Sequence, residues 1–358
     1  MTALPAIPRQ CFAASNSAEG FRNYYGEIFT DERVDRLYII KGGPGTGKSH
    51  FMRAVARCAK GRGYDTVEFY CSSDASSLDG LLLIREGAPT VGLLDGTAPH
   101  VREPAIPGAR DEMVNLGDFW DPQRLTDQRD AIAALGRSKA AAYARAYACL
   151  RGAGEMDALA ESLVSSCIHR DRVAALATRI LRGQPDGQGF EAIPALRRAL
   201  SMSGKHTLRS FEAAASSLIL PEEYYGLGFS LTAALMEVSR ARGLRVYVSY
   251  DPLCPRRVDG LLYPDTGLCV LLGDTVPPEG IPTRALPLRR YGDADALRAV
   301  RGELRRTLAL REELTDAALR HLSQASEAHF ELEKIYSAAM DFRAKETFTE
   351  RFCRRVLG

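Results

Sequence analysis

The chain has 358 residues, of which 46% are hydrophobic and 26% charged, and its net charge at neutral pH is +2. This composition is that of a globular protein with room for two domains, and the charge gives no overall reason to expect nucleic acid or acidic lipid as a partner. Eight cysteines are scattered without a C-x-x-C pair, as is typical of free thiols in a reducing compartment. The chain has neither a signal-peptide pattern nor a long apolar run, so we expect a cytoplasmic protein with no membrane partner.

A phosphate-binding loop is predicted directly after a short apolar run at residues 37–40. The residues that follow are Gly42, Gly43, Pro44, Gly45, Thr46, Gly47, Lys48, Ser49 and His50. They match G-x-x-x-x-G-K-[ST] at every fixed position, and we expect all nine to contact a bound nucleotide. The glycines let backbone N–H groups surround a triphosphate, and the helix that begins near Gly47 adds the positive end of its dipole. We therefore expect Mg-ATP here, with Lys48 on the β- and γ-phosphates and Ser49 on the Mg²⁺ ion.

Further strands are predicted at residues 66–71, 81–84 and 90–95, and the last of these, TVGLLD, ends in Asp95. An acid at the end of a buried strand is typical of the Walker B position, where it holds Mg²⁺ or one of its waters. We assign Asp95 to catalysis and to the metal. The alternative is an aspartate that only opens the turn at Gly96.

No second acid follows Asp95, so a carboxylate that activates water must come from another part of the chain. The candidates are Asp74, Asp79 and Glu103, each with a loop or capping role as its alternative. His100 is a further candidate for orienting water or sensing the γ-phosphate.

Long-period helical sequence follows the first core, which we place at residues 1–120. Apolar residues at three- and four-residue spacing predict a helical hairpin over 121–183, and a similar one over 291–358. We expect Tyr143 and Tyr147 to pack between helices. The hairpins are candidate surfaces for a protein partner, and their charged faces are expected to be solvated without nucleic acid.

The second half of the chain repeats the first. Residues 63–80 align without gaps on residues 243–260, which pairs Asp79 with Asp259 at an offset of 180 (259 − 79). A degenerate second core is expected at residues 190–290, after a Gly-rich linker. In that core Phe229 falls opposite Lys48, and Glu222 and Glu223 would repel phosphate.

We therefore expect the C-terminal half not to bind ATP productively and to face the N-terminal half as a pseudo-symmetric partner. Arg256 and Arg257 are candidate arginine-finger donors, with solvated loop arginines as the alternative.

Four stretches of the chain, IIKGGPGTGKS, YCSSDASSLDG, LLDGTAPHVREP and NLGDFWD, resemble an uncharacterised bacterial family of tandem P-loop ATPases. The resemblance covers nearly the whole chain and implies an ATPase with two nucleotide-binding-type halves. It supports residues 42–49 as the nucleotide site and gives weight to Asp74, Asp79, Asp95 and His100. The chain departs from the family in its second loop, at Phe229.

The predicted fold is therefore an α/β P-loop NTPase with parallel sheets flanked by helices, tandemly duplicated, each half with its hairpin. The predicted function is hydrolysis of Mg-ATP at a single site in the N-terminal half. One alternative is a small-molecule or nucleotide kinase in which the hairpin closes as a lid. Another is a non-catalytic switch that senses ATP.

Overall fold

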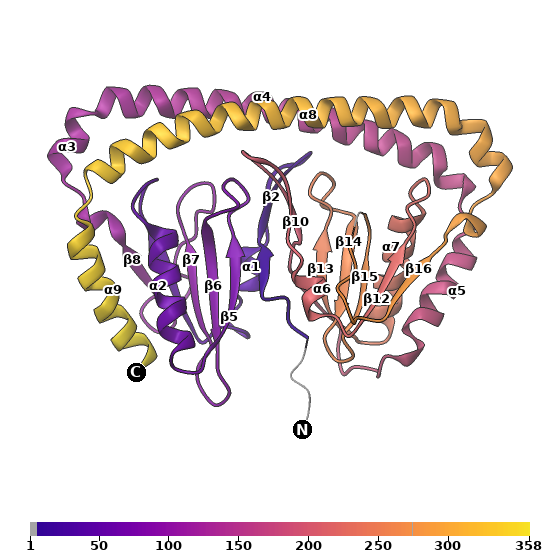
Figure 1. The fold of residues 1–358 in the computed structure, drawn as a ribbon, viewed down its shortest axis with the longest axis horizontal. Coiled ribbons are helices and arrows are strands. Elements are labelled where there is room, and N and C mark those ends of the chain that lie inside the picture. The colour runs from indigo at the N-terminus through magenta and orange to yellow at the C-terminus, as the bar shows by residue number, and fades with distance from the viewer. Residues whose placement is uncertain (1–5, 274) are drawn as a thin grey trace.

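Two α/β cores lie side by side beneath a pair of long helices in the computed structural model, which describes residues 6–273 and 275–358 (Figure 1). The long helices are α4 (Arg129–Val164) and α8 (Ala294–Ala338), which pack along each other in opposite directions and which we call the arch. None of the helices in the described ranges is both long and apolar enough to cross a membrane.

A six-stranded mixed sheet forms the N-terminal core. Its strands in spatial order are β1 (Gln10–Phe12), β5 (Asp65–Tyr70), β6 (Leu78–Ile84), β7 (Val91–Asp95), β4 (Arg36–Lys41) and β8 (Asp111–Asn115). The same core contains α1 (Tyr25–Ile28), α2 (Lys48–Lys60) and a hairpin of β2 (Ala14–Ser17) and β3 (Gly20–Asn23). In this sheet β6 runs antiparallel to both of its neighbours, and the other pairs are parallel.

The C-terminal core repeats this arrangement. Its strands in spatial order are β9 (Glu191–Pro194), β13 (Arg245–Tyr250), β14 (Val258–Tyr263), β15 (Leu268–Leu271), β12 (Ser217–Pro221) and β16 (Thr283–Leu286). It also contains α6 (Ser210–Ala214), α7 (Leu227–Ala241) and a hairpin of β10 (Arg198–Ser201) and β11 (Gly204–Thr207). Here β14 is the antiparallel strand. Identical strand order and directions are what a duplicated α/β unit predicts.

We expected parallel sheets, and most strand pairs are parallel, but each sheet is mixed because one of its strands is antiparallel to its neighbours. The connections on either side of β6 are residues 71–77 and 85–90. A parallel neighbour would need a crossover of a dozen or more residues, so connections this short return the chain antiparallel.

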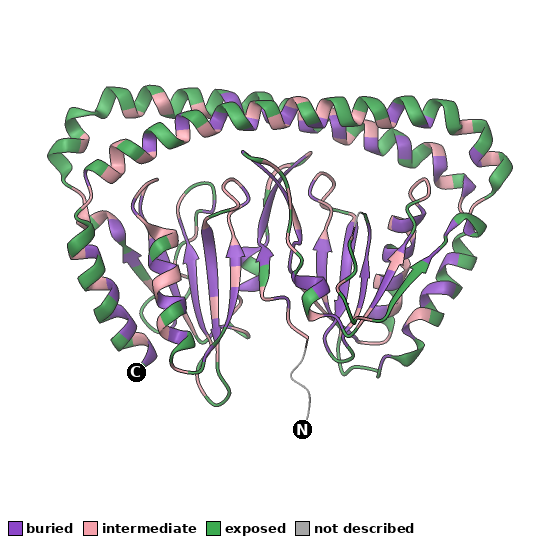
Figure 2. Ribbon diagram, viewed as in Figure 1, coloured by how far each residue is buried: buried purple, intermediate pink, exposed green. Residues whose placement is uncertain are grey.

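The interior of strand β4, residues 37–40, is apolar, as is expected of a strand that is buried on both faces. Tyr38 and Ile40 face one cluster together with Phe51 of α2. Leu37 and Ile39 face a second cluster that also contains residues of the C-terminal core, among them Phe211, Leu218 and Leu262. The two sheets therefore share this second cluster, and Figure 2 shows buried strands in both cores beneath an arch whose outer side is exposed.

The two cores also exchange backbone hydrogen bonds in symmetric pairs. Phe12 and Leu196 bond to each other at 2.7 and 3.0 Å. The N–H of Ala18 in the first hairpin donates to Leu253, and the N–H of Met202 in the second hairpin donates to Ser73, both at 3.0 Å. An approximate two-fold axis therefore relates the two halves of the chain.

The helical segments do not form the hairpins that we expected. The remaining helices are α3 (Pro122–Asp127), α5 (Arg170–Ile180) and α9 (Phe342–Leu357), with 3-10 turns η1 (Leu116–Phe119), η2 (Ser165–Cys167), η3 (Leu181–Gly183) and η4 (Arg289–Tyr291). Helix α4 packs on α8, α5 packs on α7 of the C-terminal core, and α9 packs on α2 of the N-terminal core. Small buried residues such as Ala146, Ala153, Ala318 and Ala325 let the long helices approach each other closely, so each finds its partner in the other half.

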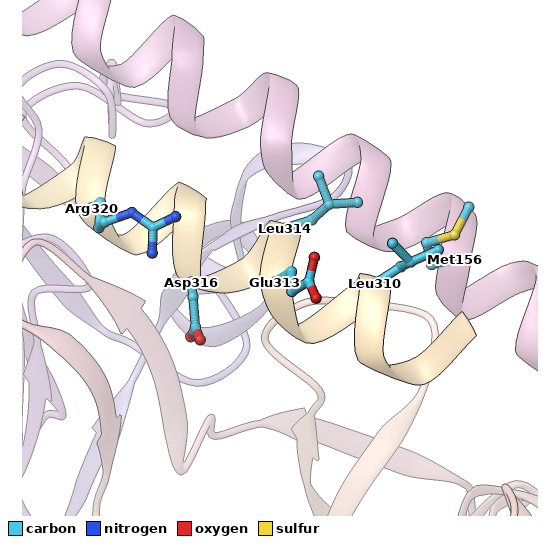
Figure 3. Close-up of a pocket in the computed structure, with 6 residues that line it drawn as sticks. All are labelled: Met156, Leu310, Glu313, Leu314, Asp316 and Arg320. Carbon is cyan, nitrogen blue, oxygen red and sulfur yellow. The ribbon is translucent and has the colours of Figure 1, made fainter. Parts of the chain in front are cut away.

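A shallow hollow lies between the arch helices (Figure 3). It is lined by Met156 of α4 and by Leu310, Glu313, Leu314, Asp316 and Arg320 of α8. This part of the arch covers the C-terminal core, so the hollow is separate from the predicted loop.

Candidate nucleotide-binding site

The predicted phosphate-binding loop joins β4 to α2 at the edge of the sheet that faces the arch (Figure 1). Gly45 and Gly47 have φ angles of +71° and +75°, a left-handed conformation that favours glycine. Gly47 is the N-cap of α2, so the first N–H groups of this helix have no intrahelical acceptor. The backbone therefore offers the donors that an anion needs.

Lys48 is folded over the loop. Its Nζ donates to the carbonyl oxygens of Gly42 and Gly43, both at 2.9 Å, and lies 3.6 Å from Oδ2 of Asp95. The structure thus brings together the two residues that we assigned to catalysis.

The other predicted loop residues surround Lys48 in the sequence and differ in exposure. The hydroxyl of Thr46 is buried and donates to the Gly43 carbonyl at 2.9 Å. The hydroxyl of Ser49 accepts a hydrogen bond from the N–H of Leu78 at 2.9 Å. Pro44 is half-buried, and His50 is exposed on the first turn of α2.

Asp95 lies at the end of β7, where it is buried, stabilises the turn and also faces Lys48. Its Oδ1 accepts from the backbone N–H of Thr97 at 2.9 Å, which stabilises the turn, while Oδ2 faces Lys48. Burial raises the pKa of Asp95, the charge of Lys48 lowers it, and the charge of Asp79 raises it further. Asp95 and Asp79 are therefore electrostatic neighbours.

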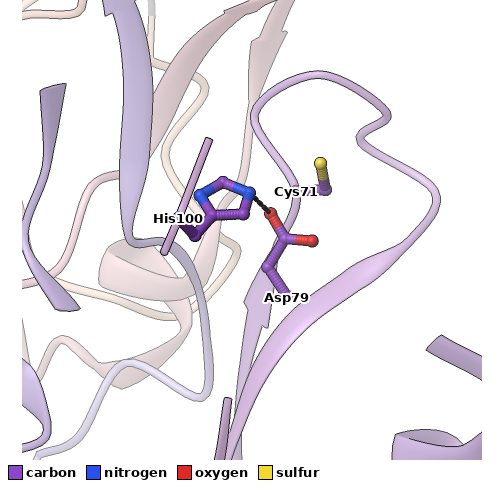
Figure 4. Close-up of side chains that lie close together, drawn as sticks. All are labelled: Cys71, Asp79 and His100. Carbon is purple, nitrogen blue, oxygen red and sulfur yellow. Dashed lines mark ion pairs between the residues drawn. The ribbon is translucent and has the colours of Figure 1, made fainter. Parts of the chain in front are cut away.

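Asp79 lies at the start of β6 and forms a buried pair with His100 (Figure 4). Nε2 of His100 is 3.0 Å from Oδ2 of Asp79, and the Tyr25 hydroxyl donates to the same oxygen at 3.4 Å. Burial opposes protonation of His100, but the hydrogen bond and charge of Asp79, with the charge of Asp95, raise its pKa overall. The imidazolium is thus favoured as the cation that faces Asp79.

The sulfur of Cys71 lies in the same cluster, and ligand atoms of Cys71, Asp79 and His100 all lie within 4.8 Å of one another. Three such donors could hold one metal ion. At the offset of 180, however, Cys71 and Asp79 correspond to Asp251 and Asp259, and Arg198 bridges these two at 3.2 and 2.5 Å. Because a protein cation occupies this position in the C-terminal core, His100 is the counterpart of Arg198 and accounts for the cluster without a metal.

Asp74 and Glu103 are not part of this cluster. Asp74 accepts from the N–H of Ser76 at 3.0 Å and from the hydroxyl of Ser77 at 2.6 Å, so it caps its own turn. Glu103 pairs with Lys41 at 2.9 Å, and its side chain is 68% exposed. Of the three candidate carboxylates, Asp79 is the one whose charge raises the pKa of Asp95.

The loop of the C-terminal core is one residue shorter, spanning residues 222–226 where the N-terminal loop spans 42–47. The buried residues Phe51 and Val55 of α2 correspond at an offset of 180 to the buried Leu231 and Leu235 of α7. Gly228 therefore lies opposite Lys48, and our alignment with Phe229 was wrong by one residue. No lysine stands in either position.

The carboxylate of Glu223 fills the anion position of this second loop. Its Oε1 accepts from the N–H of Gly226 at 2.5 Å, and Oε2 lies against Gly228. Burial raises the pKa of Glu223, and its bonds to the N–H groups of Gly226 and Gly228 lower it. A side chain thus occupies the start of α7, where a phosphate would otherwise bind.

Arg256 and Arg257 do not reach the N-terminal loop, so the arginine-finger expectation is wrong. Arg257 pairs with Asp157 and Glu161 of α4 and lies over the ring of Phe229. Arg256 is exposed and pairs with Glu19 at 3.1 Å. Both guanidinium groups are therefore engaged elsewhere.

Residues from α8 and α9 cover the N-terminal loop, a contribution that sequence reasoning missed. The hydroxyl of Ser337 donates to the Gly45 carbonyl at 3.1 Å, and Tyr336 lies against Gly43. Nζ of Lys345 approaches within 2.7 Å of the position that a Cβ on Gly47 would take. The one available signal was a lysine on the stripe of α9 that also contains Phe352, Cys353 and Leu357.

Lys345 is 2% exposed, and no acceptor among the described residues lies within hydrogen-bond distance of its Nζ, which faces the ring of Phe342 at 5.2 Å. Burial lowers its pKa. The helical segments of the two halves are related by an offset of 172. Symmetric backbone bonds fix this offset, since Asp121 donates to Ala339 as Asp293 donates to Cys167 (293 − 121 and 339 − 167). The counterpart of Lys345 is then Val173 (345 − 172), which is buried. A lysine is therefore not needed to pack this helix.

Comparison of the chain with protein-family models, with curated proteins and with solved structures finds no match. What indicates a nucleotide site in this chain is the loop motif, its geometry and the difference between the two halves.

Proposed function

We propose that the N-terminal loop binds Mg-ATP and that the protein hydrolyses it at this single site. The observation that carries the proposal is the contrast between the two loops. In the C-terminal core the carboxylate of Glu223 fills the anion position at the start of α7. The N-terminal loop keeps the donors and Lys48 and contains no acid in its sequence, so the place that Glu223 takes in the other loop is available to a phosphate.

The residues around the loop fit the chemistry of ATP hydrolysis. Lys48 would exchange its two loop carbonyl acceptors for phosphate oxygens, a contact that strengthens as charge develops on the transferring group. The hydroxyl of Ser49 and the carboxylate of Asp95 are the hard oxygen ligands that Mg²⁺ prefers, and the bound ion would neutralise the β- and γ-phosphates.

The attacking water would be oriented by Asp79, which His100 holds in place from the side. Water attacks the γ-phosphorus, the bond to the β-phosphate oxygen breaks, and ADP and phosphate leave. The proton released by the water would pass to the Asp79 carboxylate.

A non-catalytic switch is the second candidate, and the cover over the loop favours it. The hydroxyl of Ser337 donates to the loop, and the ammonium of Lys345 lies beside Gly47. Nucleotide binding would therefore change contacts with α8 and α9, and through them the surface that the arch offers to a protein partner.

The deciding experiment measures binding of Mg-ATP by calorimetry and phosphate release without an added acceptor, for wild type, Lys48→Ala and Glu223→Gln. One bound nucleotide, steady phosphate release and loss of both in Lys48→Ala would support the proposal. Binding without release would favour the switch. Release that requires an acceptor hydroxyl would favour a kinase.

Absence of binding by the wild type would refute the proposal as a whole. Two bound nucleotides in the wild type would refute the assignment of the C-terminal loop as closed. The Glu223→Gln variant tests this assignment separately, since it keeps the shape of the side chain and removes its charge.

A further inference from the structure

The arch carries two polar pairs at symmetric positions. Over the N-terminal core, Nζ of Lys139 on α4 lies 3.0 Å from Nδ1 of His329 on α8. Over the C-terminal core, Nη1 of Arg311 on α8 lies 3.2 Å from Oδ1 of Asp157 on α4. The offset of 172 relates Lys139 to Arg311 and Asp157 to His329 (311 − 139 and 329 − 157). The same two positions thus hold a basic pair in one half and an ion pair in the other.

In the C-terminal half this ion pair fastens the arch to the sheet. The carboxylate of Asp157 also accepts from Nη1 of Arg257, which lies on the connection between β13 and β14. The Asp157 side chain is 5% exposed, so one buried carboxylate joins a guanidinium of the arch to a guanidinium of the core.

In the N-terminal half the corresponding carboxylate is missing. His329 stands at the position that corresponds to Asp157, and Ser77 at the one that corresponds to Arg257 (257 − 180). The Ser77 hydroxyl donates to Asp74 and not to the arch. Lys139 remains on the arch. Burial lowers its pKa, the nearby Cys71 and Glu333 raise it, and the charge of Lys48 lowers it by a smaller amount. The acids that act on this pair already have partners, since Glu333 faces His329 at 3.5 Å and Asp74, whose pKa the charge of His329 lowers, accepts hydrogen bonds from its own turn.

Lys139 lies close to the loop, because its neighbour His329 is one turn of α8 away from Glu333, whose backbone carbonyl packs against Gly45. Lys48 of the loop and Lys139 of the arch are thus two ammonium groups beside this contact, which Ser337 also makes with Gly45. An anion between them would be stabilised by both charges in a partly desolvated setting. The phosphate-binding loop directs the terminal phosphate of a bound nucleotide to the side of Lys48.

We propose that the γ-phosphate of a nucleotide in the N-terminal loop binds Lys139 of the arch and takes the structural part that Asp157 plays in the other half. This inference depends on the proposed nucleotide site. Its consequence is that a triphosphate fastens α4 to the N-terminal core and a diphosphate does not. The arch would then report whether the γ-phosphate is present.

The test compares binding of a non-hydrolysable ATP analogue with binding of ADP, both with Mg²⁺, in wild type and Lys139→Met. We expect Lys139→Met to weaken the analogue about tenfold to 100-fold, the usual range for a lost charged hydrogen bond, and to change ADP binding by less than about threefold. Lys139→Arg keeps the charge and should retain most of the preference. Arg137→Met, an exposed change on the same helix, should alter neither ligand.

A structural readout separates this role from a general loss of stability. In the wild type the analogue should slow hydrogen exchange in the first turns of α4 more than ADP does, and Lys139→Met should abolish that difference. An unchanged ratio of analogue to ADP affinity in Lys139→Met would overturn the inference while leaving the nucleotide site in place. No binding of either nucleotide by the wild type would instead overturn the proposed function, and this inference with it.

Discussion

Asp79 and Asp259 hold the same position in the two cores, and a different cation faces each carboxylate. His100 reaches Asp79 from the segment after β7, with Nε2 3.0 Å from the carboxylate. Arg198 reaches Asp259 from β10, with Nε at 2.5 Å. Both carboxylates are buried, so each needs a partner in the folded protein. One of these partners titrates near neutral pH and the other does not.

His100→Gln should therefore destabilise the protein in a pH-dependent way. The pKa of His100 is raised on folding, so its stabilising effect is complete below the unfolded-state value of about 6.5 and is lost as the pH rises through the folded-state value. Urea unfolding should show a loss of about 3 kcal/mol at pH 6 that shrinks at higher pH. Arg198→Gln is the matched control, because its cost should stay constant between pH 6 and 9. A loss for His100→Gln that is equally constant would show that His100 is neutral in the folded protein.

Asp95→Asn should stabilise the nucleotide-free protein and remove turnover. Burial raises the pKa of Asp95, so its ionised form is disfavoured in the folded state, and stability falls as the pH rises from the unfolded-state pKa to the folded-state value. The amide keeps an oxygen for Thr97 and carries no charge. We expect a gain of about 1 kcal/mol at pH 7 together with loss of phosphate release, checked by thermal unfolding and a phosphate assay. A variant that still hydrolyses ATP would exclude Asp95 from the metal site.

Lys345→Met, like Asp95→Asn, should stabilise the nucleotide-free protein, and it should weaken nucleotide binding. A buried ammonium without an acceptor costs stability, and Val173 shows that an apolar side chain fits the corresponding place. The folded-state pKa of Lys345 lies below its ordinary value, so the unfolded chain binds the proton more strongly and wild type gains stability as the pH rises through the folded-state value.

The advantage of Lys345→Met in unfolding midpoint should therefore be largest at neutral pH and shrink at alkaline pH. Because the removed charge lies beside Gly47, affinity for Mg-ATP should fall about tenfold. Lys334→Met is the control, since Lys334 is exposed on α8 and pairs only with Glu331 at 2.6 Å. If Lys345→Met binds Mg-ATP as tightly as wild type, Lys345 has no part in phosphate binding.

Asp157→Asn should weaken the C-terminal half without affecting the nucleotide. The change leaves Arg257 and Arg311 facing a neutral group in a partly buried place, and we expect a cost of about 2 kcal/mol in unfolding free energy. Affinity for Mg-ATP should stay within about threefold of wild type, because the two sites are far apart and share no partner. A large loss of nucleotide affinity would mean that the ion pair supports the N-terminal loop through the arch.

The sequence predicted the parts of the site that are local in the chain. Lys48 and Ser49 follow their loop directly, and Asp95 ends the neighbouring strand, so a motif and an apolar run were sufficient to bring them together. The mixed sheet could also have been anticipated from the short connections around β6, although we had expected parallel strands.

What the sequence did not disclose depends on contacts between distant segments. The alanine-rich stripe of α4 fits a helix from either half, so nothing local distinguishes a hairpin from the crossed arch. The approach of Lys345 to Gly47, and of Lys139 to His329, follows from that crossing. In the C-terminal loop, similar glycine-rich spacing allowed two alignments one residue apart, and only the burial pattern of α7 decided between them.

The exchange of α5 and α9 between the cores sets an order for cotranslational folding. The ribosome makes α2 and its loop early, but α9, which covers them, emerges only after the whole C-terminal core has been synthesised. The order is reversed for the C-terminal core, because α5 precedes all of its strands and has already been synthesised when they are made. The nascent N-terminal core must therefore persist with apolar surface uncovered until the C-terminal core and α9 have been made, and exposed surface of this kind favours aggregation or capture by a chaperone during synthesis.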